Sequence, residues 1–318
     1  MATYMNPFTD VGFKRIFGQE FSKPLLIDFL NNLFYGQLHI VDLKFLDKEQ
    51  LGIFDQDRSL IYDVYCELDT GEKIIVEMQN CKQGNFKSRS IYYICESIAR
   101  QGEQGMEWNY QIKAVYLIAF LNFTLSDIDT DFRTDVLLMN KRKKQEFSDL
   151  LNLIYLQLPY FEKSAEACEN NFDRWIYLLK HMETIVKLPW PEKNPVFQRL
   201  AEISDLGSLS REERMKYDEA IRKYRDTLCV MQSQLDEGIQ IGRDQGIQIG
   251  RDEGIQIGRD QGIQIGIEKG RQQTLAEAQM QIQQNLASVA RNLKAQHVPL
   301  DVIASSTGLS IQEIENLS

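Results

Sequence analysis

The chain has 318 residues, 43% of them hydrophobic and 26% charged, which suits a globular core of roughly 150 to 200 residues with an appendage. No apolar run of about 18 residues could span a bilayer, and the first residues lack the basic and apolar segments of a signal peptide, so we expect a cytoplasmic protein. The formal net charge of -10 argues against a protein that coats nucleic acid non-specifically, but it leaves room for a local basic groove.

The cysteines and histidines bear on metal binding and redox state. Five cysteines are scattered without CxxC spacing, and the chain has only three histidines. We therefore expect reduced thiols and no zinc site. The cysteines are Cys66, Cys81, Cys95, Cys168 and Cys229.

The hydrophobic period changes three times in the first half of the chain. Apolar residues have helical spacing over residues 6–35, with breaks expected near Gly18 and Pro24. The period then changes to two, returns to helical over residues 86–101 and changes to two again. This order predicts a mixed α/β sheet with helices packed on it. The expected strands cover residues 41–53, 58–68, 73–80, 112–123, 131–139 and 151–161.

The second half of the chain is expected to be largely helical. Helical patterns cover residues 166–185 and 211–235, and a cluster of three prolines lies between them. We predict a main domain, a helical extension, a glycine-rich repeat and a small helical tail. These four parts cover residues 1–190, 191–237, 238–270 and 271–318.

Residues 238–270 repeat the octapeptide GIQIGRDQ or GIQIGRDE, which places nine of the 19 glycines four residues apart. In an α-helix this row of glycines would drift about 40° per step, and each interior glycine costs about 1 kcal/mol relative to alanine. We therefore expect a flexible spacer, or a helix that forms only when it pairs with another chain. Charged residues in every repeat exclude a membrane-spanning GxxxG helix.

The tail predicts one amphipathic helix followed by two short helices in the shape of a helix-turn-helix. Gly308 can end the first short helix, and Ser310 can cap the second with Glu313 three residues on. The polar faces of the tail carry few cations. We therefore favour packing or homo-oligomerisation through residues 238–318 over base reading, which stays open as the alternative.

The segment from Leu60 to Asn80 reads as a β-hairpin whose register can be derived. A two-residue Thr70-Gly71 loop would mix polar and apolar residues on both faces of the hairpin. A three-residue loop over residues 69–71, with Gly71 in the left-handed conformation, gives one wholly apolar face. This register pairs Tyr62 with Met78, Val64 with Val76 and Cys66 with Ile74, and on the other face Asp63 with Glu77, Tyr65 with Ile75 and Glu67 with Lys73.

The predicted register brings two carboxylates together. The Cβ atoms of Asp63 and Glu77 should lie about 5 Å apart, close enough for both side chains to hold one hard divalent cation. Gln79 projects from the same face. Without a cation or a proton between them the two carboxylates repel each other, so the pair favours a metal site over an ordinary solvated face, which stays the alternative.

Three stretches of sequence carry a family resemblance. They are NPFTDVGFKRIFG near the start, IYDVYCELDTGEKIIVEMQN at the hairpin and FKSRSIYYICESIARQG after it. The run from Asn6 to about Phe161, half of the chain, resembles the Rpn family of recombination-promoting nucleases and transposases, a branch of the PD-(D/E)xK nuclease superfamily. The resemblance implies a restriction-endonuclease-like mixed sheet flanked by helices, cleavage of DNA with Mg²⁺, and a link to recombination or transposition.

By position, Asp63 and Glu77 match the metal-binding carboxylates of that superfamily, and Gln79 stands where its general pattern has lysine. A glutamine offers only neutral hydrogen bonds, so a displaced cation would have to supply the positive charge. The candidates, in order of preference, are Lys14, Lys82 and Arg89.

Further residues are candidates for the site or for DNA contacts. Asp10 precedes Lys14 by one helical turn and is either an extra carboxylate of the site or a helix-capping acid. Arg89 and Tyr93 either face the phosphate backbone, as Lys82 could, or lie on a solvated helix face. The basic run 141–144 either touches DNA or is an exposed hairpin loop.

Three functions are compatible with this sequence. The first is a DNA endonuclease dependent on Mg²⁺ or another divalent cation, in which Asp63 and Glu77 bind the metal and Gln79 orients the water. The second is an inactive or weakly active nuclease fold that binds DNA or protein, an option that the missing lysine keeps open. The third is a self-associating module in which residues 238–318 regulate the nuclease domain by pairing or by covering its groove.

Overall fold

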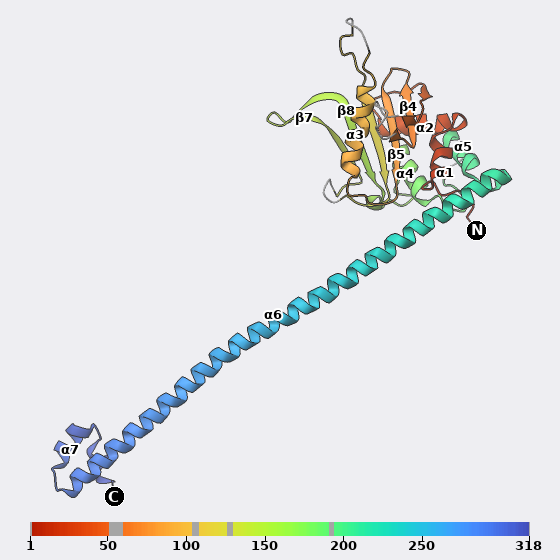
Figure 1. Ribbon diagram of the computed structural model, residues 1–318. Coiled ribbons are helices and arrows are strands. Elements are labelled where there is room, and N and C mark those ends of the chain that lie inside the picture. Colours follow the sequence, from red (N-terminus) through yellow and green to blue (C-terminus); the bar gives the residue numbers. More distant parts are fainter. Residues whose placement is uncertain (1, 51–59, 104–107, 126–129, 191–193, 318) are drawn as a thin grey trace. The chain divides into compact units, whose positions relative to one another are not determined.

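A computed structural model describes residues 2–50, 60–103, 108–125, 130–190 and 194–317 (Figure 1). The chain divides into two compact units, Met1–Ser233 and Gln234–Ser318. No helix within the described ranges is both long and apolar enough to cross a membrane.

The larger unit contains a six-stranded mixed sheet in the order β1-β4-β5-β6-β8-β7. β5, β6 and β8 run parallel to one another, and the other neighbouring pairs are antiparallel. The short strands β2 and β3 form a separate antiparallel pair. The bounds are β1 Leu43–Phe45, β2 Glu49–Gln50, β3 Leu60–Ile61, β4 Val64–Leu68, β5 Lys73–Gln79, β6 Val115–Leu121, β7 Arg133–Asn140 and β8 Gln145–Gln157.

Helices cover both faces of the sheet, which confirms the predicted α/β class. α3 (Phe86–Ala99) connects the parallel strands β5 and β6, as a parallel pair requires. The expected breaks in the first helical stretch are present, since α1 ends before Gly18 and Pro24 lies in the first turn of α2. The other bounds are α1 Asp10–Phe17, α2 Lys23–Leu33, α4 Asn171–His181, α5 Pro195–Ser204 and α6 Arg211–Ala295, with 3₁₀ turns at Glu20–Ser22, Leu158–Tyr160 and Leu206–Ser208.

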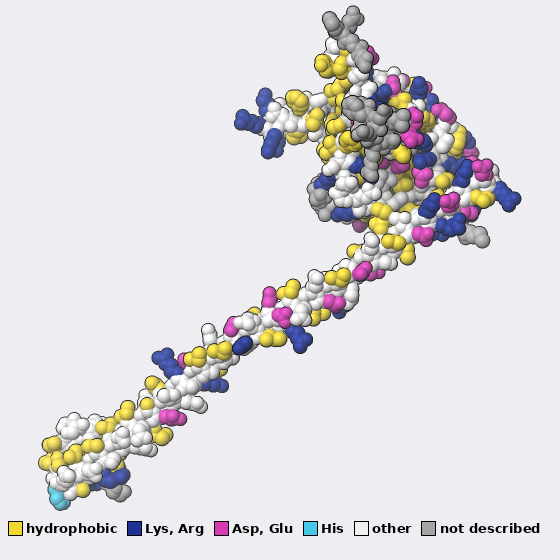
Figure 2. Space-filling view, viewed as in Figure 1, with side chains coloured by type: hydrophobic (Ala, Val, Ile, Leu, Met, Phe, Trp, Pro, Cys, Tyr) yellow, Lys and Arg dark blue, Asp and Glu magenta, His cyan; other side chains and the backbone are white. Residues whose placement is uncertain are grey.

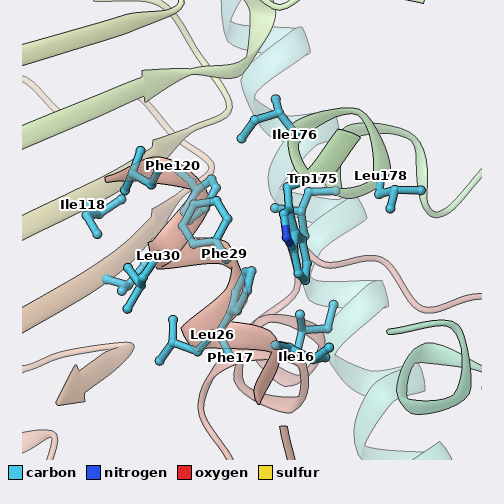
Figure 3. Close-up of a cluster of buried hydrophobic side chains, with 14 of the residues drawn as sticks. Ile16, Phe17, Leu26, Phe29, Leu30, Ile118, Phe120, Trp175, Ile176 and Leu178 are labelled. Atoms are coloured by element: carbon cyan, nitrogen blue, oxygen red, sulfur yellow. The ribbon is translucent and has the colours of Figure 1, made fainter. Parts of the chain in front are cut away.

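The larger of two cores lies between the sheet and the helices α1, α2, α4 and α5 (Figure 3). Trp175 of α4 is fully buried, and its ring centroid lies 5.8 Å from that of Phe17 and 5.9 Å from that of Phe29. Its indole Nε1 donates a 2.7 Å hydrogen bond to Asp28. Aromatic packing therefore joins α4 to the two N-terminal helices.

The second core lies between the opposite face of the sheet and α3. It includes Tyr65, Ile75, Leu117 and Ile94. Because β6 is buried on both faces, its sequence VYLIAFL is continuously apolar, as is usual for a central parallel strand.

The N-terminal segment is held against α1 at Gly12. Thr9 caps α1 by accepting a 3.0 Å hydrogen bond from the Gly12 N–H, and a Cβ on Gly12 would lie 2.1 Å from the Asn6 carbonyl oxygen. Gly12→Ala should therefore push the segment away and lower the free energy of unfolding by about 1–3 kcal/mol, measured by urea denaturation. Gly84→Ala, where a Cβ would meet nothing within 4 Å, is the matched control. Equal stability of the two variants would contradict this packing argument.

The glycine repeat is helical, which corrects the expectation of a flexible spacer. α6 continues through residues 238–270 without interruption. Gln240, Gln248 and Gln256 each donate a hydrogen bond to an aspartate four residues on. Side-chain pairs at this spacing stabilise helices, and the expectation based on the cost of each glycine did not include them. Pairing of residues 238–318 with a second chain stays a prediction.

The smaller unit ends in two short helices, α7 (Leu300–Thr307) and α8 (Ile311–Glu315), which have the predicted caps. Gly308 has φ +75°, and Ser310 and Glu313 form a reciprocal capping box. Ile303 and Ile314 form a small core with Ala290 of α6. A compact helical tail therefore stands at the end of α6.

Candidate active site

β4 and β5 form their hairpin in the register predicted from the sequence. Val64 lies opposite Val76, and Tyr65 opposite Ile75. The turn covers residues 69–71, where Gly71 has φ +99° and its N–H donates to the Leu68 carbonyl at 2.9 Å. The three-residue loop is thus confirmed.

The ladder stops one residue short of the predicted carboxylate pair, because Asp63 lies in a bend before β4. The bend interrupts the alternation of side chains, so Tyr62 is buried on the face opposite to the predicted one. Its ring centroid lies 5.0 Å from that of Tyr65 and 5.1 Å from that of Tyr93, which belongs to α3. The face of the hairpin that carries Tyr65 and Glu77 is therefore largely buried as well.

Hydrogen bonds still join Asp63 to the end of β5. The Asp63 N–H donates to Glu77 Oε1 at 3.3 Å, and the Met78 N–H donates to Asp63 Oδ2 at 2.9 Å. The bend thus holds the carboxylate of Asp63 beside that of Glu77, as the sequence predicted, by different backbone geometry.

Burial and mutual repulsion disfavour negative charge on this pair. Only 4% of Glu77 is exposed, and burial, followed by the nearby charge of Asp63, raises the pKa of Glu77 to about 8. Burial also raises the pKa of Asp63, against the Met78 hydrogen bond and the charge of Lys14. A cation bound between the two side chains would favour their ionised forms, because its positive charge opposes both effects.

The raised pKa of Glu77 predicts a pH-dependent stability in metal-free protein. Because its pKa is higher in the folded chain than its ordinary value of 4.5, the folded state holds an extra proton between about pH 4.5 and 8. The associated stability is complete below pH 4.5 and is lost as the pH rises through 8. Relative to Glu77→Gln, wild type should lose roughly 2 to 4 kcal/mol between pH 5 and 9, measured by urea denaturation in EDTA. Parallel pH profiles would contradict the prediction.

Two lysines act on Asp63, one of which the sequence did not reveal. Lys14 lies in α1 and pairs at 2.5 Å with Asp10, a first-turn acid of that helix. Lys48 precedes β2, and its carbonyl accepts from the Tyr62 N–H at 3.0 Å. The charges of both lysines lower the pKa of Asp63, and that of Asp10 raises it. Pairing of β2 with β3 is what brings Lys48 near, and no local pattern signals it.

Gln79 lies between Glu77 and a cation from α3. Its Nε2 donates to Glu77 Oε2 at 3.2 Å, and its Oε1 accepts from Arg89 Nη2 at 2.7 Å. The positive charge of Arg89 lowers the pKa of Glu77. Arg89 therefore belongs to the same group of side chains as the carboxylates.

The remaining candidates occupy different positions. Tyr93 is half-buried beside Arg89, and Lys82 is exposed between β5 and α3. The basic turn 141–144 lies at the tip of the β7–β8 hairpin, where cations gather in Figure 2. It precedes β8, whereas Gln157 at the far end of β8 is level with Leu121 and hence with Gln79. The basic turn is therefore at the opposite end of the sheet from the carboxylates.

A cavity of about 400 Å³ lies between the start of α1 and the first turns of α6. Asp10 and Asn80 line it from one side, and Lys216 and Lys223 from the other. The first part of α6 thus forms one wall of a cavity that reaches the end of β5 at Asn80.

Comparison with known families agrees with this architecture. The model of the PD-(D/E)XK nuclease family transposases matches residues 7–234, which contain the sheet, the carboxylate pair and the first part of α6. The match ends next to the boundary between the two units at Ser233. Comparisons with curated proteins and with solved structures give no match. Since the family match spans well over half of its length, the chain belongs to the PD-(D/E)XK nuclease family transposases.

Proposed function

We propose that the protein is a Mg²⁺-dependent DNA endonuclease that hydrolyses phosphodiester bonds, with Asp63 and Glu77 as metal ligands. The observation that carries this proposal is the convergence of two largely buried carboxylates at the end of β5, linked through the backbone of Asp63 and Met78. Family membership adds to it, because nucleases of this superfamily generally use divalent metal ions.

The donor set fits Mg²⁺ better than a transition metal. Nowhere in the described part of the chain do three or more His, Cys, Asp or Glu side chains gather as a metal cluster. Mg²⁺ is commonly held by one or two carboxylates, with water and substrate phosphate completing its shell. Asp63 and Glu77 supply that number of carboxylates.

The chain's own residues would bind the ion and arrange the reacting groups. Asp63 and Glu77 bind the cation through carboxylate oxygens, which requires both to be deprotonated. A bound divalent cation polarises the scissile phosphate and lowers the pKa of the attacking water. Gln79 is held by Glu77 and Arg89, so its neutral amide can orient a water but supplies no charge.

DNA would reach the carboxylates along surfaces that the chain already presents. Arg89, Tyr93 and Lys82 approach from the α3 side. Lys216 and Lys223 line the cavity on the α6 side. Lys216 and Lys223 are paired with Glu212 and Glu219, so the positive charge that phosphate contacts need comes from the α3 side.

The test is nicking of supercoiled plasmid by the full chain in Mg²⁺ or in EDTA, together with calorimetric titration of Mg²⁺ into metal-free protein. Nicking in Mg²⁺ alone, with heat of binding at one site, is the expected result. A protein that binds no Mg²⁺ and cuts no DNA would be a binding module on a nuclease fold, and the proposal would be wrong.

A further inference from the structure

We propose that Arg89, positioned through Gln79, supplies the positive charge that a lysine at position 79 supplies in the general superfamily pattern. This inference rests on the proposed nuclease function. It assigns the positive charge to a residue of α3, whereas the superfamily motif places that charge on β5.

The first support is a continuous chain of hydrogen bonds. Gln79 donates through Nε2 to the Glu77 carboxylate at 3.2 Å and accepts through Oε1 from Arg89 Nη2 at 2.7 Å. Both ends of a neutral amide are thereby used, one on an acid and the other on a cation. A lysine ammonium has donors but no acceptor, so it could not make both bonds.

The second support is the set of contacts that holds the guanidinium in place. Arg89 Nη1 donates to Gln83 Oε1 at 2.6 Å. The guanidinium carbon lies 5.2 Å from the ring centroid of Phe86 and 5.9 Å from that of Tyr93. An arginine fixed by two hydrogen bonds and two rings loses little entropy when it binds an anion.

The third support is an unused donor. Arg89 Nε is buried and has no hydrogen-bond partner among the described residues. Leaving a buried donor unsatisfied costs roughly 1–3 kcal/mol, more when the group is charged. The guanidinium thus keeps a donor that the described residues do not use, and guanidinium is well matched to phosphate geometry.

The other cations near the carboxylates are placed less favourably. Lys14 is paired with Asp10 at 2.5 Å, and its charge acts on Asp63. Lys82 is exposed in the segment after β5. Arg89 alone among the three candidates from the sequence is hydrogen-bonded to Gln79.

This arrangement predicts that the positive charge can be moved from position 89 to position 79. Arg89→Gln should lower kcat for plasmid nicking about 100-fold with a change in KM below about 3-fold, the size expected for loss of one stabilising donor. Gln79→Lys alone would put an ammonium against the guanidinium and should not raise activity. The double variant Gln79→Lys/Arg89→Gln should recover at least about 10-fold over Arg89→Gln. Arg89→Lys should fall between wild type and Arg89→Gln.

A readout without DNA separates this role from a structural one. Because Arg89 disfavours a second cation beside Glu77, Arg89→Gln should bind Mg²⁺ about 3- to 10-fold more tightly by calorimetry while it nicks more slowly. Lys113→Gln is the matched control, since Lys113 is exposed and precedes β6 at the far end of the sheet from Gln79. It should leave both measurements unchanged.

The outcomes distinguish the two proposals. Wild type that neither binds Mg²⁺ nor cuts DNA overturns the proposed function, and this inference with it. Wild type that cuts, with Arg89→Gln within about 3-fold of it or with a double variant no better than Arg89→Gln, overturns the role of Arg89 alone. Thermal melting of each variant identifies any variant that fails to fold. If Arg89→Gln fails to fold, Arg89→Lys and the double variant Gln79→Lys/Arg89→Lys are compared by the same criterion.

Discussion

Replacement of Asp63 by asparagine is expected to lower plasmid nicking in Mg²⁺ by at least about 10³-fold. Loss of metal assistance removes several kcal/mol of transition-state stabilisation, and about 4 kcal/mol corresponds to that factor. The amide oxygen can still accept from the Met78 N–H, so the bend before β4 should keep its shape. Glu77→Gln should have an effect of the same size, since both carboxylates are proposed ligands.

Asp69→Asn is the matched control for this prediction. Asp69 lies in the turn of the same hairpin and is exposed, so loss of its charge should leave nicking unchanged. Calorimetry should show weaker Mg²⁺ binding in Asp63→Asn and wild-type binding in Asp69→Asn. If Asp63→Asn cuts as fast as wild type, the assignment of the active site is wrong.

Truncation of Trp175 should produce a larger loss of stability than the other single substitutions proposed for the core. Its ring is fully buried, contacts Phe17 and Phe29 of the N-terminal helices and lies 5.4 Å from Phe197 of α5. Trp175→Ala removes this packing and leaves a cavity, which costs about 3–5 kcal/mol. It also removes the indole donor from Asp28, whose pKa burial already raises. Urea denaturation of the full chain, monitored by far-ultraviolet circular dichroism, measures the loss of stability.

Phe147→Ala controls for the removal of an aromatic side chain. Phe147 of β8 is 76% exposed, so the change should cost less than about 0.5 kcal/mol. A similar loss in the two variants would show that Trp175 does not hold α4 against α1 and α2. A loss confined to Trp175→Ala would confirm the core of Figure 3.

The hairpin shows how far local patterning reaches. Alternation of apolar residues and the need for a glycine with positive φ selected the three-residue loop, and the pairs from Val64 to Glu67 follow from it. The same alternation placed Tyr62 on the wrong face, because it assumes an unbroken strand. The bend at Asp63 is maintained by contacts with β5 that lie 14 and 15 residues away.

The cations of the site, in contrast, could not be ranked from local sequence patterns. The sequence named Lys14, Lys82 and Arg89 as candidates and preferred them in that order. Only the packing of α3 against the end of β5 brings Arg89 to Gln79, and only the pairing of β2 with β3 brings Lys48 near Asp63. Neither distance depends on sequence spacing, so no local period could have ranked these residues.

By itself, the sequence determined the mixed α/β sheet, the hairpin register, the caps of the tail helices and the approach of Asp63 to Glu77. These features follow from periodicity, turn chemistry and capping, which can be read directly along the sequence. Tertiary structure alone decided the bend that turns Tyr62 inward, the burial that raises the pKa of Glu77, and the choice of Arg89 as the partner of Gln79. Burial and charge proximity depend on elements that meet only after the chain has folded, because they sum over neighbours distant in sequence.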